Sequence, residues 1–268
     1  MTMRLQGQKV LVTGGGRGIG RTIALAMARE GADLIIAADV STEVSSAVRE
    51  IEGSGRRAMG HVLDITDSEQ VNRFAESVEK QFGKVNILVN NAGVVGKRFF
   101  VFQSDDVVWR RTIEVNLFGT YYCTKAFLPQ IIEHKKGRII NIASISGKQA
   151  SPTNSAYAAS KHAVIGLTRT VAAELGLLGL TEITCNAICP GVTDTDMLKG
   201  PGMILDELAR LLGTTREKVV EERIKTMNIQ HRIMEPEEIA AMAVFLASDD
   251  ARGITGQAIN VCGGSVFY

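Results

Sequence analysis

The chain has 268 residues, with 30 basic and 29 acidic side chains and a formal net charge of +1. A balanced charge without blocks of one sign argues against a nucleic-acid or membrane-surface partner. The apolar run near the start is too short for a secretory signal, and no segment approaches the roughly 18 apolar residues of a spanning helix. The four cysteines lack metal-binding spacing, so we expect buried reduced thiols, no metal site and a cytoplasmic protein.

Short apolar runs alternate with helix-length amphipathic segments along the whole chain. Seven runs have strand character: 9–14, 33–39, 57–64, 86–93, 137–144, 182–191 and 257–264. Helical patterns cover 21–32, 42–52, 66–82, 105–134, 155–177 and 237–248. Apolar strands separated by helices predict a parallel sheet covered on both faces, and right-handed crossovers make it doubly wound. Without a linker or repeat, we predict one domain over residues 1–268, an α/β Rossmann-type fold with seven strands.

The connection 192–235 interrupts this rhythm, because loops in compact domains rarely exceed about 12–15 residues. Apolar residues recur at helical spacing in 204–212, and a Thr214–Glu217 capping box precedes a second apolar pattern. A similar box, Thr66–Glu69, is expected to open the helix after the third strand. We predict a two-helix lid within 192–235. An amphipathic insertion that serves only an oligomer contact remains the alternative.

A glycine-rich turn, TGGGRGIG at 13–20, ends the first strand and opens the first helix. Gly14, Gly18 and Gly20 allow a tight turn and a close approach of the backbone to a pyrophosphate. The amides and dipole at the helix N-terminus would then bind that anion. The spacing is GxxxGxG, and a turn with positive φ would also favour glycine. The position between strand and helix favours dinucleotide binding.

Asp39 ends the second strand, where a carboxylate can accept hydrogen bonds from both hydroxyls of an adenosine ribose. It would repel a 2′-phosphate, so Asp39 predicts NAD rather than NADP. Arg17 favours NADP instead, because an arginine in the loop could bind the 2′-phosphate. A solvated strand-end carboxylate is the alternative for Asp39. Asp64 and Ile65 could line the adenine, although Asp64 could equally be a carboxylate at a helix N-terminus.

These motifs, with several further ones, resemble the classical short-chain dehydrogenase/reductase family along nearly the whole chain. In order they are TGGGRGIG, NNAG at 90–93, VNLFGTYY with Asn116, IINIASISG with Ser144, YAASK with Tyr157 and Lys161, and PGVTDTDM at 190–197. Single motifs could arise by chance, but the ordered set is specific. The resemblance implies these cofactor-binding residues: Gly14, Arg17, Gly18, Ile19, Gly20, Asp39, Asp64, Ile65, Asn91, Gly93, Tyr157, Lys161, Pro190, Gly191, Thr193 and Thr195.

The resemblance also implies a catalytic set of Asn116, Ser144, Tyr157 and Lys161. A hydride moves between a carbinol carbon and C4 of nicotinamide, while the hydroxyl loses a proton. Tyrosine, with an ordinary pKa of about 10, is a poor base unless a cation favours the phenolate. Lys161 is one helical turn from Tyr157 and can supply that cation. Ser144 would bond the substrate oxygen, and Asn116 would hold a water linked to Lys161.

Two positions depart from the family pattern. The last strand reads NVCGG, with Cys262 where aspartate is common, and Thr193 replaces a common aliphatic residue. We expect the Cys262 change to affect packing or assembly more than chemistry. We expect the Thr193 change to have little effect, because the backbone of this segment makes most of the contact with the nicotinamide carboxamide.

The sequence therefore predicts an NAD-dependent oxidoreductase that interconverts a small-molecule secondary alcohol and its ketone, with alcohol oxidation as the physiological direction. One alternative is an NADP-dependent 3-oxoacyl thioester reductase. Another, of a different class, is a dinucleotide-sensing regulator without turnover. Family resemblance implies a homotetramer in which the 105–134 and 155–177 helices pair.

Polar residues on the loops near the expected pocket raise the hypothesis of an anionic substrate: Lys97, Arg98, Lys148 and Gln149. Ordinary surface cations on loops are the alternative. Similar enzymes for 3-hydroxybutyrate carry histidine and lysine where this chain has Ser146 and Asn154, which disfavours that particular substrate. A small or cyclic secondary alcohol, a polyol and a 3-oxoacyl thioester all remain open.

Overall fold

The computed structural model describes residues 3–268 and contains one parallel seven-stranded sheet. Its strands are β1 (Lys9–Thr13), β2 (Asp33–Ala38), β3 (Ala58–Val62), β4 (Ile87–Asn90), β5 (Gly137–Ile142), β6 (Ile183–Pro190) and β7 (Ala258–Val261). They lie in the order β3-β2-β1-β4-β5-β6-β7, so the strand order reverses between β1 and β4. The predicted Rossmann-type sheet is confirmed, although several strands end earlier than predicted because the chain bends away into loops at the carboxyl edge.

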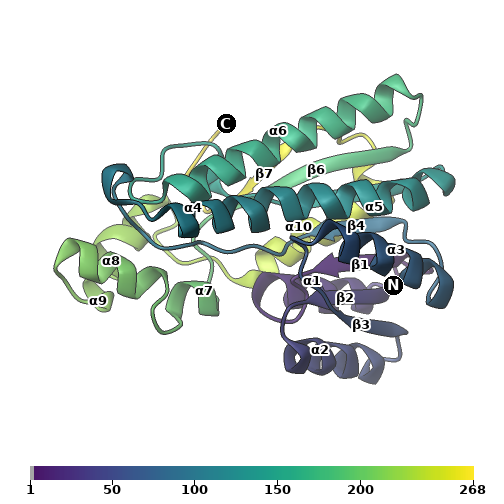
Figure 1. Ribbon diagram of the computed structural model, residues 1–268, viewed down its shortest axis with the longest axis horizontal. Helices are drawn as coiled ribbons and strands as arrows, with labels where there is room; N and C mark the ends of the chain where they lie inside the picture. Colours follow the sequence, from purple (N-terminus) through teal and green to yellow (C-terminus); the bar gives the residue numbers. More distant parts are fainter. Residues whose placement is uncertain (1–2) are drawn as a thin grey trace.

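Helices cover both faces of this sheet (Figure 1). One face carries α1 (Gly18–Arg29), α2 (Ser41–Gly53) and α10 (Pro236–Ala247). The other carries α3 (Ser68–Gln81), α4 (Asp106–Ile113), α5 (Thr120–Glu133) and α6 (Ser155–Leu177). Each layer buries the apolar stripe of its helices against fully buried strand residues, as a doubly wound fold requires.

The prediction of one helix over 105–134 is wrong in one respect. The segment η2 (Glu114–Gly119) is a π-helix that separates α4 from α5. The apolar pattern continues on both sides of it, so periodicity could not reveal the wider turn. Asn116 lies inside η2 and is fully buried. Wider turns of this kind occur often at functional sites.

Both predicted capping boxes are displaced by one residue. Asp67 caps α3, and its Oδ1 accepts from the amides of Glu69 and Gln70, both at 3.0 Å. Thr66 instead bonds Asp64, which lies two residues earlier. A carboxylate can accept from two amides at once, which gives Asp67 the advantage over its neighbour.

The second box is displaced in the same way. Thr215, not Thr214, caps α9 (Arg216–Val219), and its Oγ1 accepts from the amide of Lys218 at 3.4 Å. Thr214 and Thr215 are adjacent, and the local turn of the backbone, not the sequence spacing, decides which of them caps the helix.

The segment 192–235 is helical, but with more pieces than the two predicted. It contains α7 (Asp196–Lys199), α8 (Ile204–Leu212), α9, the π-helix η4 (Val220–Ile224) and the 3₁₀ turn η5 (Lys225–Met227). Leu198, Leu205, Val219 and Ile224 are buried together as a small separate core. The segment follows β6 and extends beyond the carboxyl edge of the sheet, beside the start of α4 (Figure 1). Within residues 3–268, no helix is long and apolar enough to span a membrane.

Candidate active site

The glycine loop is packed tightly against the end of β4. Gly14 has φ 62°, and a Cβ at Gly20 would lie 2.2 Å from the carbonyl oxygen of Gly14. The helix α1 starts at Gly18, and the side chain of its N-cap, Arg17, makes no capping hydrogen bond. In the described structure the first turn of α1 also carries no acidic residue. Its amides therefore retain the capacity to bind a phosphate, and the loop fits a dinucleotide.

The segment after β6 faces this loop. A Cβ at Gly18 would lie 3.6 Å from Cγ2 of Thr195, which caps α7. Pro190 ends β6, and the amide of the following Gly191 donates to the carbonyl of Val261 at 2.9 Å.

Thr193 is buried and forms an isolated bridge with Met234, and its Oγ1 donates to the carbonyl of Gly191 at 3.0 Å. The Thr193 backbone is thus held in place by its pairing with Met234. Cys262 packs with Ile145 and Val266 in a small apolar cluster.

Asn91 holds the glycine loop to β4. Its Nδ2 donates to the carbonyl oxygens of Thr13 and Gly14 at 3.0 and 3.1 Å. Thr13 Oγ1 in turn accepts from the amides of Asn91 and Ala92, at 3.1 and 3.2 Å. The contacts of Asn91 are therefore to the loop itself. Thr13 was not singled out from the sequence, because a threonine ending a strand carries no distinctive signal.

The residues expected near the adenosine lie at the ends of β2 and β3. Asp39 is exposed, and Arg17 pairs with Glu43 of α2 at 3.4 Å. Ile19 packs partly buried against the core beneath α1. Because Arg17 already faces a carboxylate, its charge is partly balanced, while Asp39 faces solvent.

Asp64 is held by neighbours of its own. Its Oδ1 accepts from the amide and hydroxyl of Thr66 at 2.9 and 2.7 Å, and Arg111 lies 3.3 Å from Oδ2. Burial alone would raise the pKa of Asp64, but these hydrogen bonds and the Arg111 charge hold it below its ordinary value. Ile65 is buried against Gly119 of η2. Asp64 thus has the local bonding of a turn carboxylate, while the N-cap of α3 is Asp67.

Ser144, Tyr157 and Lys161 meet at the carboxyl end of β5. Ser144 caps the short turn η3 (Ile145–Gly147), and its Oγ accepts from the amide of Ser146 at 3.1 Å. Tyr157 and Lys161 extend from the first turns of α6, with Lys161 Nζ 5.6 Å from the centre of the Tyr157 ring. Lys161 is buried and donates to the carbonyl oxygen of Ile142 at 2.8 Å.

The charges around Tyr157 include one that the sequence did not indicate. Burial raises the pKa of Tyr157 above its ordinary value, while the Ser144 hydroxyl and the Arg98 guanidinium oppose that rise. Burial also lowers the pKa of Lys161 to about 8. The Lys161 ammonium donates to the Ile142 carbonyl and lies 5.6 Å from the centre of the Tyr157 ring, so its role as the cation that favours the phenolate stays a prediction. Arg98 was not expected to act on the phenol.

Asn116 bonds protein groups at every polar atom. Its Oδ1 accepts from the Val94 amide at 2.8 Å, and its Nδ2 donates to the Val94 carbonyl at 2.9 Å and to Ser160 Oγ at 3.0 Å. Its own carbonyl accepts from Thr120 Oγ1 at 2.8 Å. These contacts make it a clamp on the loop segment that follows Gly93, and its expected role in holding a water stays a prediction.

Gly93 lies between the side chains of Asn116 and Lys161. A Cβ there would be 3.1 Å from Asn116 Oδ1 and 3.5 Å from Lys161 Nζ. Cys189, on β6, is fully buried beside this group, and burial raises the pKa of its thiol to about 11. Sequence spacing gave no sign of Cys189 or of Ser160, since both are small residues within ordinary elements.

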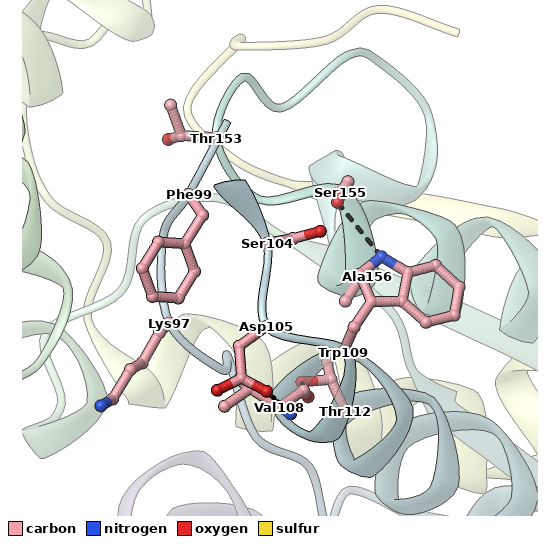
Figure 2. A pocket seen from close by; sticks show the side chains of 10 residues that line it. All are labelled: Lys97, Phe99, Ser104, Asp105, Val108, Trp109, Thr112, Thr153, Ser155 and Ala156. Atoms are coloured by element: carbon pink, nitrogen blue, oxygen red, sulfur yellow. Dashed lines mark hydrogen bonds between the residues drawn. The ribbon is translucent and has the colours of Figure 1, made fainter. Parts of the chain in front are cut away.

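A cleft lies beside α6, the helix that carries Tyr157 (Figure 2). Phe99 and Thr153 form one side of it, and Trp109 forms the other, with its Nε1 donating to Ser155 Oγ at 3.2 Å. Among the described residues, no group of histidines, cysteines or carboxylates is arranged to hold a metal ion.

Comparison with known proteins decides the family. Residues 8–202 match the family model described as short chain dehydrogenase. The chain belongs to the short-chain dehydrogenase family. It is accordingly an oxidoreductase with the family's Rossmann-like fold.

Relatives of this dehydrogenase differ in what their names say they act on. It is 37% identical over 266 residues to the 3-oxoacyl-(acyl-carrier-protein) reductase of Thermotoga maritima, covering 99% of this chain and 100% of the relative. Carveol dehydrogenase from Mycobacterium avium, solved with NAD, superposes with a TM-score of 0.92 at 28% identity, covering 98% and 99% of the two chains. An actinorhodin polyketide ketoreductase variant with NADPH gives a TM-score of 0.89 at 32% identity, covering 100% of both chains.

Proposed function

We propose that this dehydrogenase interconverts a secondary alcohol and its ketone, with Tyr157 as the general acid and base. The observation that carries the proposal is the convergence of Ser144, Tyr157 and Lys161 at one end of the sheet, beside a loop that fits a dinucleotide. A bound nicotinamide would supply or accept the hydride. Tyr157 gives or takes the proton on the substrate oxygen, and Ser144 orients that oxygen.

NAD is the proposed cofactor, with NADP as the alternative. The exposed Asp39 can bond the two ribose hydroxyls, whereas a 2′-phosphate would meet its negative charge. The pairing of Arg17 with Glu43 weakens the argument for a phosphate site. A strong preference of the purified enzyme for NADPH over NADH would overturn this proposal.

A second candidate is reduction of a 3-oxoacyl thioester. It is favoured by the resemblance to the Thermotoga reductase and to the polyketide ketoreductase, and these relatives support it better than they support a simple alcohol substrate. The same Tyr157 chemistry serves both, because each reaction adds a hydride to a ketone carbon and a proton to its oxygen.

The remaining proposals concern organisation. We propose one catalytic domain, with 192–235 as a lid over the site, in a cytoplasmic homotetramer. Two partly exposed aromatic side chains, Phe118 at 44% and Tyr121 at 40%, support pairing through the η2 and α5 surface. A dinucleotide sensor without turnover is disfavoured because Ser144, Tyr157 and Lys161 are all present and close together.

Tyr157→Phe tests the mechanism. General acid–base catalysis contributes about 10²–10⁴-fold, so we expect a loss of that order in kcat/KM with NADH binding retained. Steady-state assays of a responsive ketone and fluorescence titration of NADH measure the two properties. A variant that keeps more than a small fraction of the rate contradicts the proposed role.

A further inference from the structure

Arg98 lies on the loop after β4, close enough to Tyr157 for its charge to act on the phenol. Its Nη1 donates to the carbonyl of Pro152 at 3.3 Å and to Thr153 Oγ1 at 3.4 Å. The amide of the next residue, Phe99, donates to the Thr153 carbonyl at 2.8 Å. Three hydrogen bonds thus tie this loop to the one that leads into α6, and they fix where the guanidinium stands.

The other edge of the guanidinium has no such partners. Arg98 Nε is buried and makes no hydrogen bond, and within residues 3–268 no bond from Nη2 is found either. Nε and Nη2 form the side of the fork that matches the two oxygens of a carboxylate. A buried donor without an acceptor is costly, so such a group calls for an explanation.

Nearby carboxylates do not fill this role. Glu207 of α8 is close enough to act electrostatically on Arg98, but its Oε2 lies 2.9 Å from Arg210 Nη2. Among the described ion pairs none includes Arg98. Arg210 donates instead to the backbone carbonyl of Arg98 at 3.4 Å, so the lid contacts this loop without neutralising its charge.

Backbone strain occurs at the residue that holds the guanidinium. Thr153 has φ 66°, a left-handed conformation that a β-branched residue rarely adopts. Strain of this kind is usually found where function fixes the backbone. The neighbouring cation Lys148 differs from Arg98, because its Nζ donates to the carbonyls of Ala258 and Tyr268, both at 2.5 Å.

We propose that Arg98 determines substrate specificity by binding a carboxylate of the substrate through its Nε and Nη2 edge, beside the carbonyl that Tyr157 protonates. The substrate class is then an oxo acid and the corresponding hydroxy acid. This inference rests on the proposed function, and it adds a second recognition point to the same site. A neutral ester or thioester offers one carbonyl acceptor in place of two carboxylate oxygens and fits that edge less well.

The test compares matched substrates in the direction of ketone reduction. We would measure kcat/KM for 3-, 4- and 5-oxohexanoate, each beside its methyl ester, and the binding of hexanoate and methyl hexanoate to the enzyme–NADH complex by calorimetry. The wild type is expected to prefer at least one acid over its ester by about tenfold or more, as a bidentate charged contact requires. In Arg98→Met that ratio should fall to near one, and Arg98→Lys should restore part of it.

Arg110→Met is the matched control, since it removes an exposed arginine of α4 and changes the net charge equally. It should leave the ratio as in the wild type. A wild type that prefers the esters or an N-acetylcysteamine thioester in both assays would overturn the proposal and favour the thioester class. Binding of the acids without reduction of any ketone would instead contradict the proposed function.

Thermal unfolding of the Arg98 variants separates recognition from folding. Loss of the acid preference in a variant with unchanged unfolding supports the proposal. If Arg98→Met unfolds early, the decision rests on Arg98→Lys, which keeps the charge without the fork. An Arg98→Lys enzyme with the full acid preference would contradict bidentate binding.

Discussion

Tyr157 and Lys161 are both ionisable groups in a site that removes them from water. Burial disfavours the charged form of each, so it raises the pKa of the phenol and lowers that of the ammonium. The Lys161 ammonium is partly compensated by the carbonyl of Ile142, and the Arg98 charge opposes the rise in the pKa of the phenol. We therefore expect the proton chemistry of Tyr157 to depend on Arg98 as well as on Lys161.

The pH dependence follows from these shifts. Ketone reduction needs neutral Tyr157 as the proton donor and benefits from a charged Lys161. Because the pKa of Tyr157 is raised and that of Lys161 is lowered to about 8, Lys161 loses its proton first as pH rises. We expect kcat/KM for reduction to be level below about pH 7 and to fall as pH passes about 8. A profile that stays level to about pH 10 contradicts a required ammonium.

Asp39 is the residue on which cofactor choice is expected to depend. Replacing it with alanine removes the charge that would repel a 2′-phosphate and leaves Arg17 nearby in the loop. The preference for NADH over NADPH should fall by about tenfold, equivalent to about 1.4 kcal/mol. The ratio of kcat/KM for the two cofactors measures this. An unchanged ratio in a stable variant would assign the choice to other residues.

At the scale of elements, the site depends on how strands and loops are fastened to each other. Asn91 binds the glycine loop to β4, and Asn116, from the π-helix η2, binds the backbone that follows. These side-chain amides replace backbone pairing at the carboxyl edge, where the sheet ladder has ended. Their removal would leave buried backbone groups without partners, at about 1–3 kcal/mol each.

Gly20→Ala tests the packing of the glycine loop. The added Cβ would lie 2.2 Å from the carbonyl oxygen of Gly14 and 2.3 Å from Asn91 Nδ2, so loop and strand must separate. We expect NADH affinity to fall by more than about tenfold and stability by about 1–3 kcal/mol. Gly166→Ala on α6 is the control, because its Cβ meets nothing within 4 Å. It should be neutral or stabilising by up to about 1 kcal/mol. Equal behaviour of the two variants would contradict this account.

At the scale of the whole molecule, the parallel sheet gathers residues from distant parts of the chain along one edge. The glycine loop, the segment after β4, Ser144 and the lid all follow the carboxyl ends of strands, and the strand order reverses between β1 and β4. In open α/β sheets such a reversal opens the crevice in which ligands bind. The segment 192–235, which we propose as a lid, has its own small core separate from those of the sheet.

The proposed homotetramer is tested at this scale. Phe118→Asp combined with Tyr121→Asp would place charges on the η2 and α5 surface, where an interface would bury them. Light scattering is expected to give four chain masses for the wild type and fewer for the double variant. Val62→Asp, at the end of the edge strand β3, should leave the mass unchanged. A monomeric wild type would contradict the proposal directly.

The resemblance to the family indicated Ser144, Tyr157 and Lys161 as candidates, and the sequence alone determined the sheet, the order of helices and the glycine loop. These follow from local patterns, since burial on both faces makes strands uniformly apolar and a dinucleotide loop needs glycine at set positions. The tertiary structure alone decided what each side chain faces. It turned Lys161 toward Ile142, bound Asp64 to Thr66, widened the helix at Asn116 and brought Arg98 beside Tyr157. Such contacts depend on where each buried side chain points and which partner it meets there. Residue spacing along the chain carries no information about either.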